Sequence, residues 1–156
     1  MNSTTARSEH RIIPISAKRQ LKILLVEDDT ALCEILKSIF EDRGYACVAC
    51  TDAADFGQVF RSFQPDLILV DYLLPTSNGG ELCLGIKKNE AAANIPVVMM
   101  SSLPAYMLPL NFYNCDAFIQ KPFSINQLLK PVSSLLSNCG KMTSDHKNNR
   151  SSRLSN

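Results

Sequence analysis

The chain has 156 residues and a net charge of +1, so there is room for one packed core but not for two ordinary domains. Residues 21–136 hold 8 of the 16 basic residues and 13 of the 15 acidic ones, a balance that argues against a nucleic-acid-binding fold. The start MNSTTARSEHR lacks the apolar stretch of a signal peptide, no apolar run is long enough to span a membrane, and the six cysteines suit a reducing compartment. We therefore expect a cytoplasmic protein.

The two ends of the chain differ from its middle. Residues 1–20 are rich in Ser, Thr and Arg and are interrupted by Pro14, which predicts a flexible basic N-terminal arm. Residues 138–156 are polar and basic, which predicts a disordered C-terminal tail. A single domain over residues 21–137 is expected between them.

Short apolar runs alternate with helical patterns across this domain. Ile23–Val26 predicts a strand, and the apolar residues from Leu32 to Phe40 share one face of a helix that Asp29 or Thr30 can cap and Gly44 ends. The unit repeats, with strands expected at 45–50, 67–70, 97–100 and 117–119 and helices at 53–63, 80–89, 105–112 and 125–137. Five strands alternating with five helices predict an α/β fold, a doubly wound five-stranded parallel sheet in the flavodoxin-like order 2-1-3-4-5.

Prolines disturb the last third of the pattern. Pro104 and Pro109 predict a short or irregular fourth helix, and Pro131 should kink the fifth helix because its nitrogen carries no hydrogen. Ser124 and Gln127 form a capping box where that last helix begins.

Two cysteines fit a CxxC pattern, Cys47-Val-Ala-Cys50. They fall in an expected strand, where an odd separation points the two side chains to opposite faces. We therefore expect buried structural cysteines here, and no zinc site or redox pair.

Charged residues follow three of the expected strands. Glu27, Asp28 and Asp29 follow the first, Asp71 the third and Lys121 the fifth. Because the carboxyl ends of parallel strands meet at one edge of a sheet, these groups should converge. Clustered carboxylates repel one another unless a cation lies among them, and Mg²⁺ prefers oxygen ligands. Helix capping alone explains Asp29.

Four motifs contain these residues: LLVEDD, LVDYLLPTSNG, VVMMSS and FIQKPF. With them, residues 21 to about 137 closely resemble the receiver domain of bacterial two-component response regulators, of the stand-alone, single-domain type. The resemblance implies a phospho-acceptor signalling module of a two-component system or phosphorelay, which binds a partner differently once phosphorylated.

The resemblance also implies roles for single residues. Asp71 would be the phosphoacceptor, and Lys121, in a Lys121–Pro122 pair that is commonly cis in this family, would offset the phosphoryl charge. Ser101 and Phe118 would be the hydroxyl and the aromatic residue that move on phosphorylation. The expected Mg²⁺ ligands are Glu27, Asp28, Asp71 and the backbone carbonyl of Leu73.

Partners follow from what the domain lacks. His10 and His146 fall outside it, so a histidine kinase or histidine phosphotransfer protein should supply the phosphoryl group, and an unknown protein should be the downstream target. The segment after the domain is too short for a winged helix, so no direct DNA binding is expected. Leu73 and Leu103 would flank the phosphoryl group and hinder an attacking water, which predicts slow self-dephosphorylation. The domain would catalyse only reactions on itself.

Two other functions remain open. A constitutive interaction domain could keep this fold without taking phosphate, although such a protein would tolerate loss of the acids, Ser101 and Lys121. A Mg²⁺-dependent phosphatase with an aspartyl-phosphate intermediate is disfavoured, because those enzymes carry DxDxT after the first strand, whereas Asp28, Asp29 and Thr30 are consecutive here.

Overall fold

The computed structural model describes residues 19–145, with side chains up to residue 138. The expected N-terminal arm therefore lies almost wholly outside the described residues, as does the last part of the expected C-terminal tail, residues 146–156. Within the described range, none of the helices has the length and hydropathy of a membrane-spanning segment.

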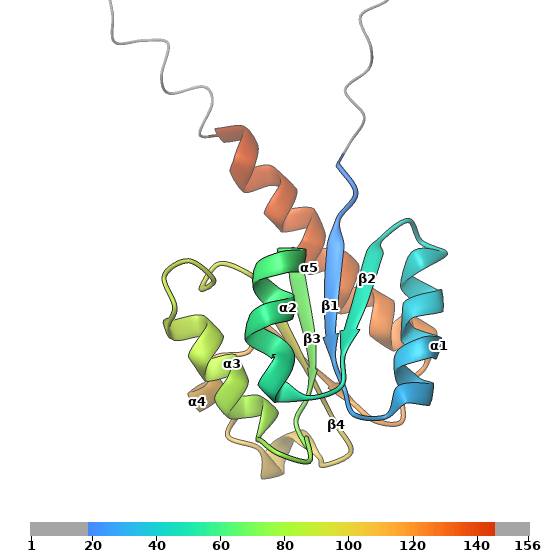
Figure 1. Cartoon of the computed structure of the whole chain (residues 1–156), viewed down its shortest axis with the longest axis vertical. Coiled ribbons are helices and arrows are strands. Elements are labelled where there is room, and N and C mark those ends of the chain that lie inside the picture. Colours follow the sequence, from blue (N-terminus) through green and yellow to red (C-terminus); the bar gives the residue numbers. More distant parts are fainter. Residues whose placement is uncertain (1–18, 146–156) are drawn as a thin grey trace, which may run out of the picture.

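A parallel five-stranded sheet forms the centre of the fold, in the order β2-β1-β3-β4-β5 (Figure 1). The strands are β1 (Lys22–Val26), β2 (Ala46–Cys50), β3 (Leu67–Asp71), β4 (Val97–Ser101) and β5 (Ala117–Gln120). Every residue of β3 and β4 is buried, because helices cover both faces of the sheet. The predicted fold class and strand order are confirmed.

The helices lie on the two faces of the sheet. They are α1 (Thr30–Glu41), α2 (Phe56–Phe63), α3 (Gly79–Lys88), α4 (Leu110–Tyr113) and α5 (Ile125–Asp145), with short 3₁₀ turns η1 (Ala53–Asp55) and η2 (Ala105–Met107). Asp29 caps α1 by accepting a hydrogen bond from the Leu32 amide at 3.0 Å. The capping box of α5 also forms, since Ser124 N donates to Gln127 Oε1 and Gln127 N donates to Ser124 Oγ.

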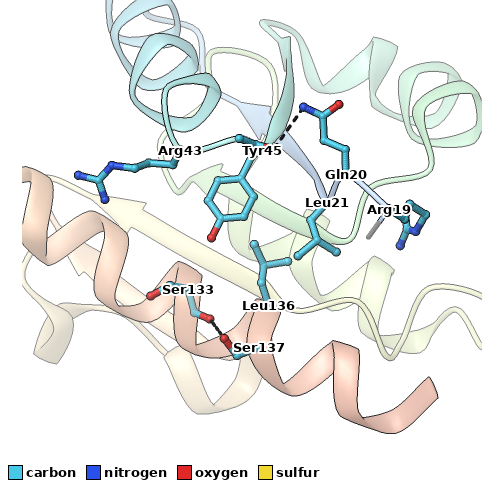
Figure 2. A pocket seen from close by; sticks show the side chains of 9 residues that line it. Arg19, Gln20, Leu21, Arg43, Tyr45, Ser133, Leu136 and Ser137 are labelled. Atoms are coloured by element: carbon cyan, nitrogen blue, oxygen red, sulfur yellow. Dashed lines mark hydrogen bonds between the residues drawn. The ribbon is translucent and has the colours of Figure 1, made fainter. Parts of the chain in front are cut away.

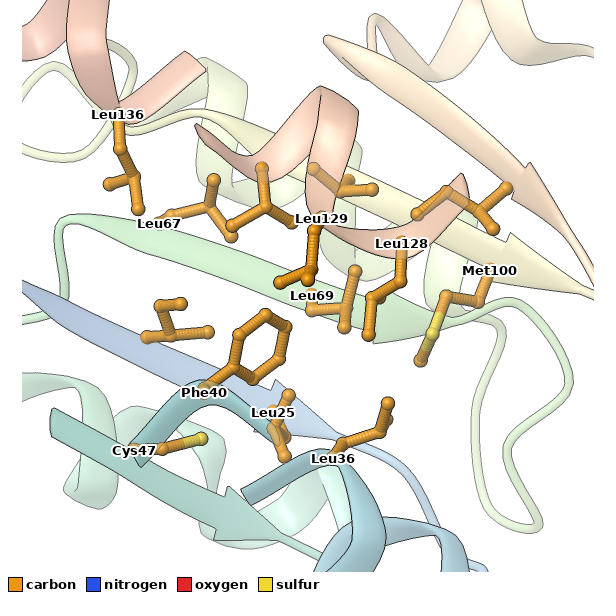
Figure 3. Close-up of a cluster of buried hydrophobic side chains, with 14 residues drawn as sticks. Leu25, Leu36, Phe40, Cys47, Leu67, Leu69, Met100, Leu128, Leu129 and Leu136 are labelled. Carbon is orange, nitrogen blue, oxygen red and sulfur yellow. The ribbon is translucent and has the colours of Figure 1, made fainter. Parts of the chain in front are cut away.

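Apolar side chains fill one core on each side of the sheet. Helices α1 and α5 pack over one face, where Phe40, Leu69 and Leu128 are fully buried (Figure 3). Helices α2, α3 and α4 pack over the other face, against Leu24, Ile68 and other strand residues. Cys47 belongs to the first core and Cys50 to the second, as the spacing predicted. Burial raises the pKa of the Cys47 thiol to about 12, so it is protonated at neutral pH.

The fourth helical segment is irregular, as the prolines predicted. After η2, Pro109 precedes a helix of only four residues, which ends at Asn114 in the left-handed conformation. The Tyr113 ring anchors this single turn, because it is buried against Gly80 of α3 and lies 6.0 Å from the Tyr72 ring, centroid to centroid. A methyl group on Gly80 would overlap that ring.

Helix α5 is longer than the sequence predicted. It continues through Pro131 to Asp145, the last described residue, whereas the helix was expected to end near Ser137 and give way to a tail from residue 138. The prediction gave weight to the polar composition of residues 138–145, but no proline occurs there, and a glycine such as Gly140 costs a helix only about 1 kcal/mol.

The first described residues lie at the amino-terminal edge of the sheet. Arg19 pairs with Asp66, which precedes β3, and Lys22 Nζ donates to the Phe63 carbonyl at the end of α2. Gln20 Nε2 donates to the Gly44 carbonyl on the other side of β1 (Figure 2). The chain therefore enters the domain held between the end of α2 and the α1–β2 turn.

We predict that Gly79→Ala is strongly destabilising. A Cβ atom there would overlap the backbone carbonyl of Asp71, and backbone cannot move aside as a side chain can, so a loss of about 3 kcal/mol or more in the free energy of unfolding is expected. Gly85→Ala is the matched control in the same helix, since its Cβ would meet no atom within 4 Å. Urea unfolding of both variants checks this, and equal losses would contradict it.

Candidate functional site

Three carboxylates meet at the carboxyl edge of the sheet. Glu27 and Asp28 follow β1 and Asp71 ends β3, and each offers an oxygen within 4.8 Å of the others. Glu27 and Asp71 are buried, at 1% and 6% exposure, while Asp28 faces solvent. The sequence prediction that these side chains converge is correct. Asp29 points its carboxylate at the α1 backbone instead, as its capping role predicted.

Lys121 reaches the carboxylates from the loop after β5. Its Nζ lies 2.6 Å from Glu27 Oε2 and 3.2 Å from Asp71 Oδ2. Its backbone amide donates to the Ser101 carbonyl at 2.7 Å, and the following Lys121–Pro122 bond is cis. The hydrogen bond from its backbone amide holds the base of the lysine beside β4.

The electrostatics of the site reflect an excess of negative charge. Burial, together with the nearby Asp71 carboxylate, raises the pKa of Glu27 despite its hydrogen bond to Lys121. Burial alone would lower the pKa of Lys121, but the hydrogen bond to Glu27 and the charge of Asp71 outweigh it and the pKa is raised. Lys121 is therefore cationic at neutral pH and in contact with two acids.

Ser101 ends β4 beside the acids and is fully buried. Its Oγ accepts a hydrogen bond from the Leu103 amide at 3.0 Å, which leaves the hydroxyl proton available for another acceptor. Phe118 pairs with Met99 across the β4–β5 register and packs, half-buried, against the core formed with α2, α3 and α4.

The loop after Asp71 is folded tightly back onto the strand. Leu73 forms an isolated bridge with Asn78, whose side chain caps α3 by accepting from the Gly80 amide at 2.7 Å. Gly79 N donates to the Tyr72 carbonyl at 2.9 Å. This turn brings the start of α3 against the Asp71 backbone and leaves the Leu73 side chain 49% exposed.

The acids fit a magnesium ion by their chemistry. Two of the three carboxylates are buried, and one ammonium group faces a pair of them, so negative charge remains uncompensated. Hard oxygen donors within a few ångströms of one another suit Mg²⁺ better than a softer metal.

Two contacts around the site were not anticipated from the sequence. Tyr72, next to Asp71, receives a hydrogen bond from Asn78 Nδ2 at 3.1 Å and faces Tyr113 of α4. Thr76 Oγ1 donates to Asp52 Oδ1 at 3.0 Å, joining the β3–α3 loop to the β2–α2 loop. Tyr113 is 41 positions from Tyr72, and Asp52 is 24 positions from Thr76, so no local pattern signals these two pairings.

Known proteins resemble the chain over this whole region. The family model described as response regulator receiver domain matches residues 23–133. Regulatory protein VanRB of Enterococcus faecalis is 30% identical over 80% of this chain and 56% of its own length. Phosphate regulon transcriptional regulatory protein PhoB of Pseudomonas aeruginosa is 29% identical over 76% of this chain and 52% of its own length.

Solved structures agree. A CheY-like response regulator receiver domain protein from Methanospirillum hungatei superposes with a TM-score of 0.71 at 27% identity, covering 80% of this chain and 99% of that one. The chain spans about half the length of the curated relatives it matches. The similarity to the curated relatives therefore concerns only about half of each of those proteins.

We predict strong coupling between Glu27 and Lys121. Lys121→Met should lower the free energy of unfolding by about 3 kcal/mol, because it leaves a buried carboxylate without its partner. Adding Glu27→Gln should restore much of that loss, since the uncompensated charge is removed. Urea unfolding of the two single variants and the double variant, without divalent cations, measures the coupling. Additive losses would contradict it.

Proposed function

The chain belongs to the response regulator receiver domain family, and we propose that it accepts a phosphoryl group on Asp71 and thereby switches the binding of a partner protein. One observation supports this most: the Asp71 carboxylate is buried at a strand end, 3.2 Å from Lys121 and beside two further carboxylates. If each of these charged groups were at the surface only to be solvated by water, there would be no reason for all of them to lie together at one edge of the sheet.

The proposed reaction is a transfer between side chains. An Asp71 carboxylate oxygen attacks the phosphorus of a phosphohistidine, an O–P bond forms, and the P–N bond breaks to release the imidazole. Lys121, already between Glu27 and Asp71, then holds a phosphoryl oxygen by its positive charge.

Magnesium would complete the site. Glu27, Asp28, Asp71 and the backbone carbonyl of Leu73 are the proposed ligands, and the ion would offset the charge of the phosphoryl oxygens. Asp28 is the exposed member of the set, so it is the ligand that an entering ion would meet first.

Ser101 and Phe118 are proposed to carry the switch. The hydroxyl proton of Ser101 is not used in the bond that Oγ accepts from Leu103 N, so it can be donated to a phosphoryl oxygen. Phe118 is half-buried and lies two positions before the end of β5. Because part of its ring is still exposed, we expect it to move inward when Ser101 moves.

Receiver domains of this family are phosphorylated by histidine kinases. For this chain we propose a histidine kinase or histidine phosphotransfer protein as donor and a protein as downstream target, in the cytoplasm. The only catalysis proposed is on the chain itself. The stand-alone arrangement and the absence of DNA binding stay predictions, since PhoB, a curated relative, is a transcriptional regulatory protein of which the matched region covers only 52%.

We predict that Asp71 is the residue that becomes phosphorylated. After incubation with acetyl phosphate and Mg²⁺, intact mass spectrometry should show the addition of one phosphoryl group to the wild type and none to Asp71→Asn. Folded wild-type protein that gains no phosphoryl group would instead favour the alternative function, a constitutive interaction domain.

Magnesium should stabilise the protein through the same acids. At a concentration 100 times its Kd, a ligand that binds only the folded state adds about 2.7 kcal/mol to the free energy of unfolding. The melting temperature should therefore rise with Mg²⁺ in the wild type and much less in Asp28→Asn, while Asp29→Asn, whose carboxylate caps α1, should respond as the wild type does. An undiminished response of Asp28→Asn would count against the proposed ligand set.

Loss of the phosphoryl group should be slow and should depend on Leu103. Leu103→Glu places a carboxylate where it can orient an attacking water, and we expect hydrolysis roughly tenfold faster, equivalent to a barrier about 1.4 kcal/mol lower. The decay of the phosphorylated mass with time measures this. An unchanged half-life would refute the role given to Leu103.

A further inference from the structure

A groove of about 430 Å³ lies between α2 and α3, on the face of the sheet away from α1 and α5. Its walls are mainly apolar, with Phe56 and Phe60 on α2 and Leu82 and Ile86 on α3. Figure 1 shows the two helices side by side in front of the sheet. The groove plays no part in the phosphorylation chemistry proposed above.

Two glycines keep the groove open. Gly57 of α2 and Gly85 of α3 both line it. A Cβ on Gly85 would meet no atom within 4 Å, and one on Gly57 would meet only the flexible Arg61 guanidinium at 3.4 Å. Glycine weakens a helix relative to alanine. Close packing requires a glycine at Gly79 and Gly80, but it does not require one at Gly57 or Gly85. Both of the latter glycines can be explained if they leave space in the groove for an occupant.

We propose that the occupant is the segment Ile12-Ile13-Pro14-Ile15 of the same chain. It holds three isoleucines in an otherwise mostly polar stretch, residues 1–20. β-Branched apolar side chains gain by leaving water, and the groove offers aromatic and aliphatic walls. The segment lies outside the described residues.

The entry point of the chain supports this choice. Arg19 is held by Asp66 and Lys22 by the Phe63 carbonyl, so the backbone reaches β1 beside the carboxyl end of α2. Residues 12–18 can extend about 23 Å, whereas the eight residues of α2 cover about 12 Å. The segment is therefore long enough to follow α2 along the groove.

Charge and polarity favour this groove over the other nearby hollow. A chain running from Arg19 toward the start of α3 brings Arg11 near Glu81, which lines the groove and is exposed. The hollow in Figure 2 is lined by Arg19 itself, but its walls are mixed: two arginines, a glutamine and two serines lie beside Leu21, Tyr45 and Leu136, so it suits isoleucine less well than the mainly apolar groove does.

Tryptophan fluorescence of the full chain tests the proposal, because the natural sequence contains no tryptophan. Ile13→Trp provides one reporter and Ile15→Trp a second, in case one position does not accept the larger ring. A docked reporter should emit at shorter wavelength than the same protein in denaturant. Gly85→Leu, which fills the groove, should move the emission to that of the denatured protein.

The control is Glu34→Leu, which introduces the same leucine side chain at an exposed position of α1, away from the groove, and should leave the emission unchanged. Solvent-exposed emission from both reporters in the parent chain would overturn the proposal. So would shorter-wavelength emission that Gly85→Leu does not change, since the segment would then be docked elsewhere. Acyl-phosphate labelling of Asp71 reports the phosphorylation chemistry separately and is expected to be the same in all these variants.

Discussion

Parallel pairing of β1, β3 and β4 is the constraint on which the site depends. It sends the carboxyl ends of three buried strands to one edge, and each strand delivers a polar side chain there: Glu27, Asp71 and Ser101. Because helices bury both faces, the edge is the one place where such groups can meet with access to water. The apolar strands are thus the reason why the acids are both close together and partly desolvated.

Lys121 partly offsets the repulsion between the buried carboxylates. Two buried carboxylates repel each other, and a lysine hydrogen-bonded to one and 3.2 Å from the other offsets part of the cost. The compensation is incomplete, because burial and, to a lesser extent, the Asp71 charge still raise the pKa of Glu27. The proposed Mg²⁺ would offset the remaining negative charge, and the proposed phosphoryl transfer depends on that offset because the bare acids would repel the phosphoryl group. The same imbalance therefore links the stability of the domain to the proposed metal site and the proposed chemistry.

Much of the fold and the site could be predicted from sequence because both depend on local patterns. Runs such as Leu67–Val70 identify buried strands, and the residue that follows each run is then placed at the sheet edge by topology alone. The sequence failed where composition was used instead of pattern, at the end of α5, which continues to Asp145. It also gave no sign of Tyr72 facing Tyr113 or of Arg19 pairing with Asp66, since those contacts arise only when distant segments pack. The close approach of Gly79 to the Asp71 carbonyl is likewise a contact that the sequence pattern does not signal.

The one-turn length of α4 has a mechanical consequence. Its four residues form too few hydrogen bonds to make it rigid alone, so its position is set by where the Tyr113 ring rests between Gly80 and Tyr72. The exposed side chains of Tyr106, Met107 and Phe112 lie on this segment and the turn before it. The placement of that exposed surface therefore depends on how α4 packs against α3, where the Tyr113 ring lies against Gly80 and Cys83 Sγ donates to the Tyr113 carbonyl.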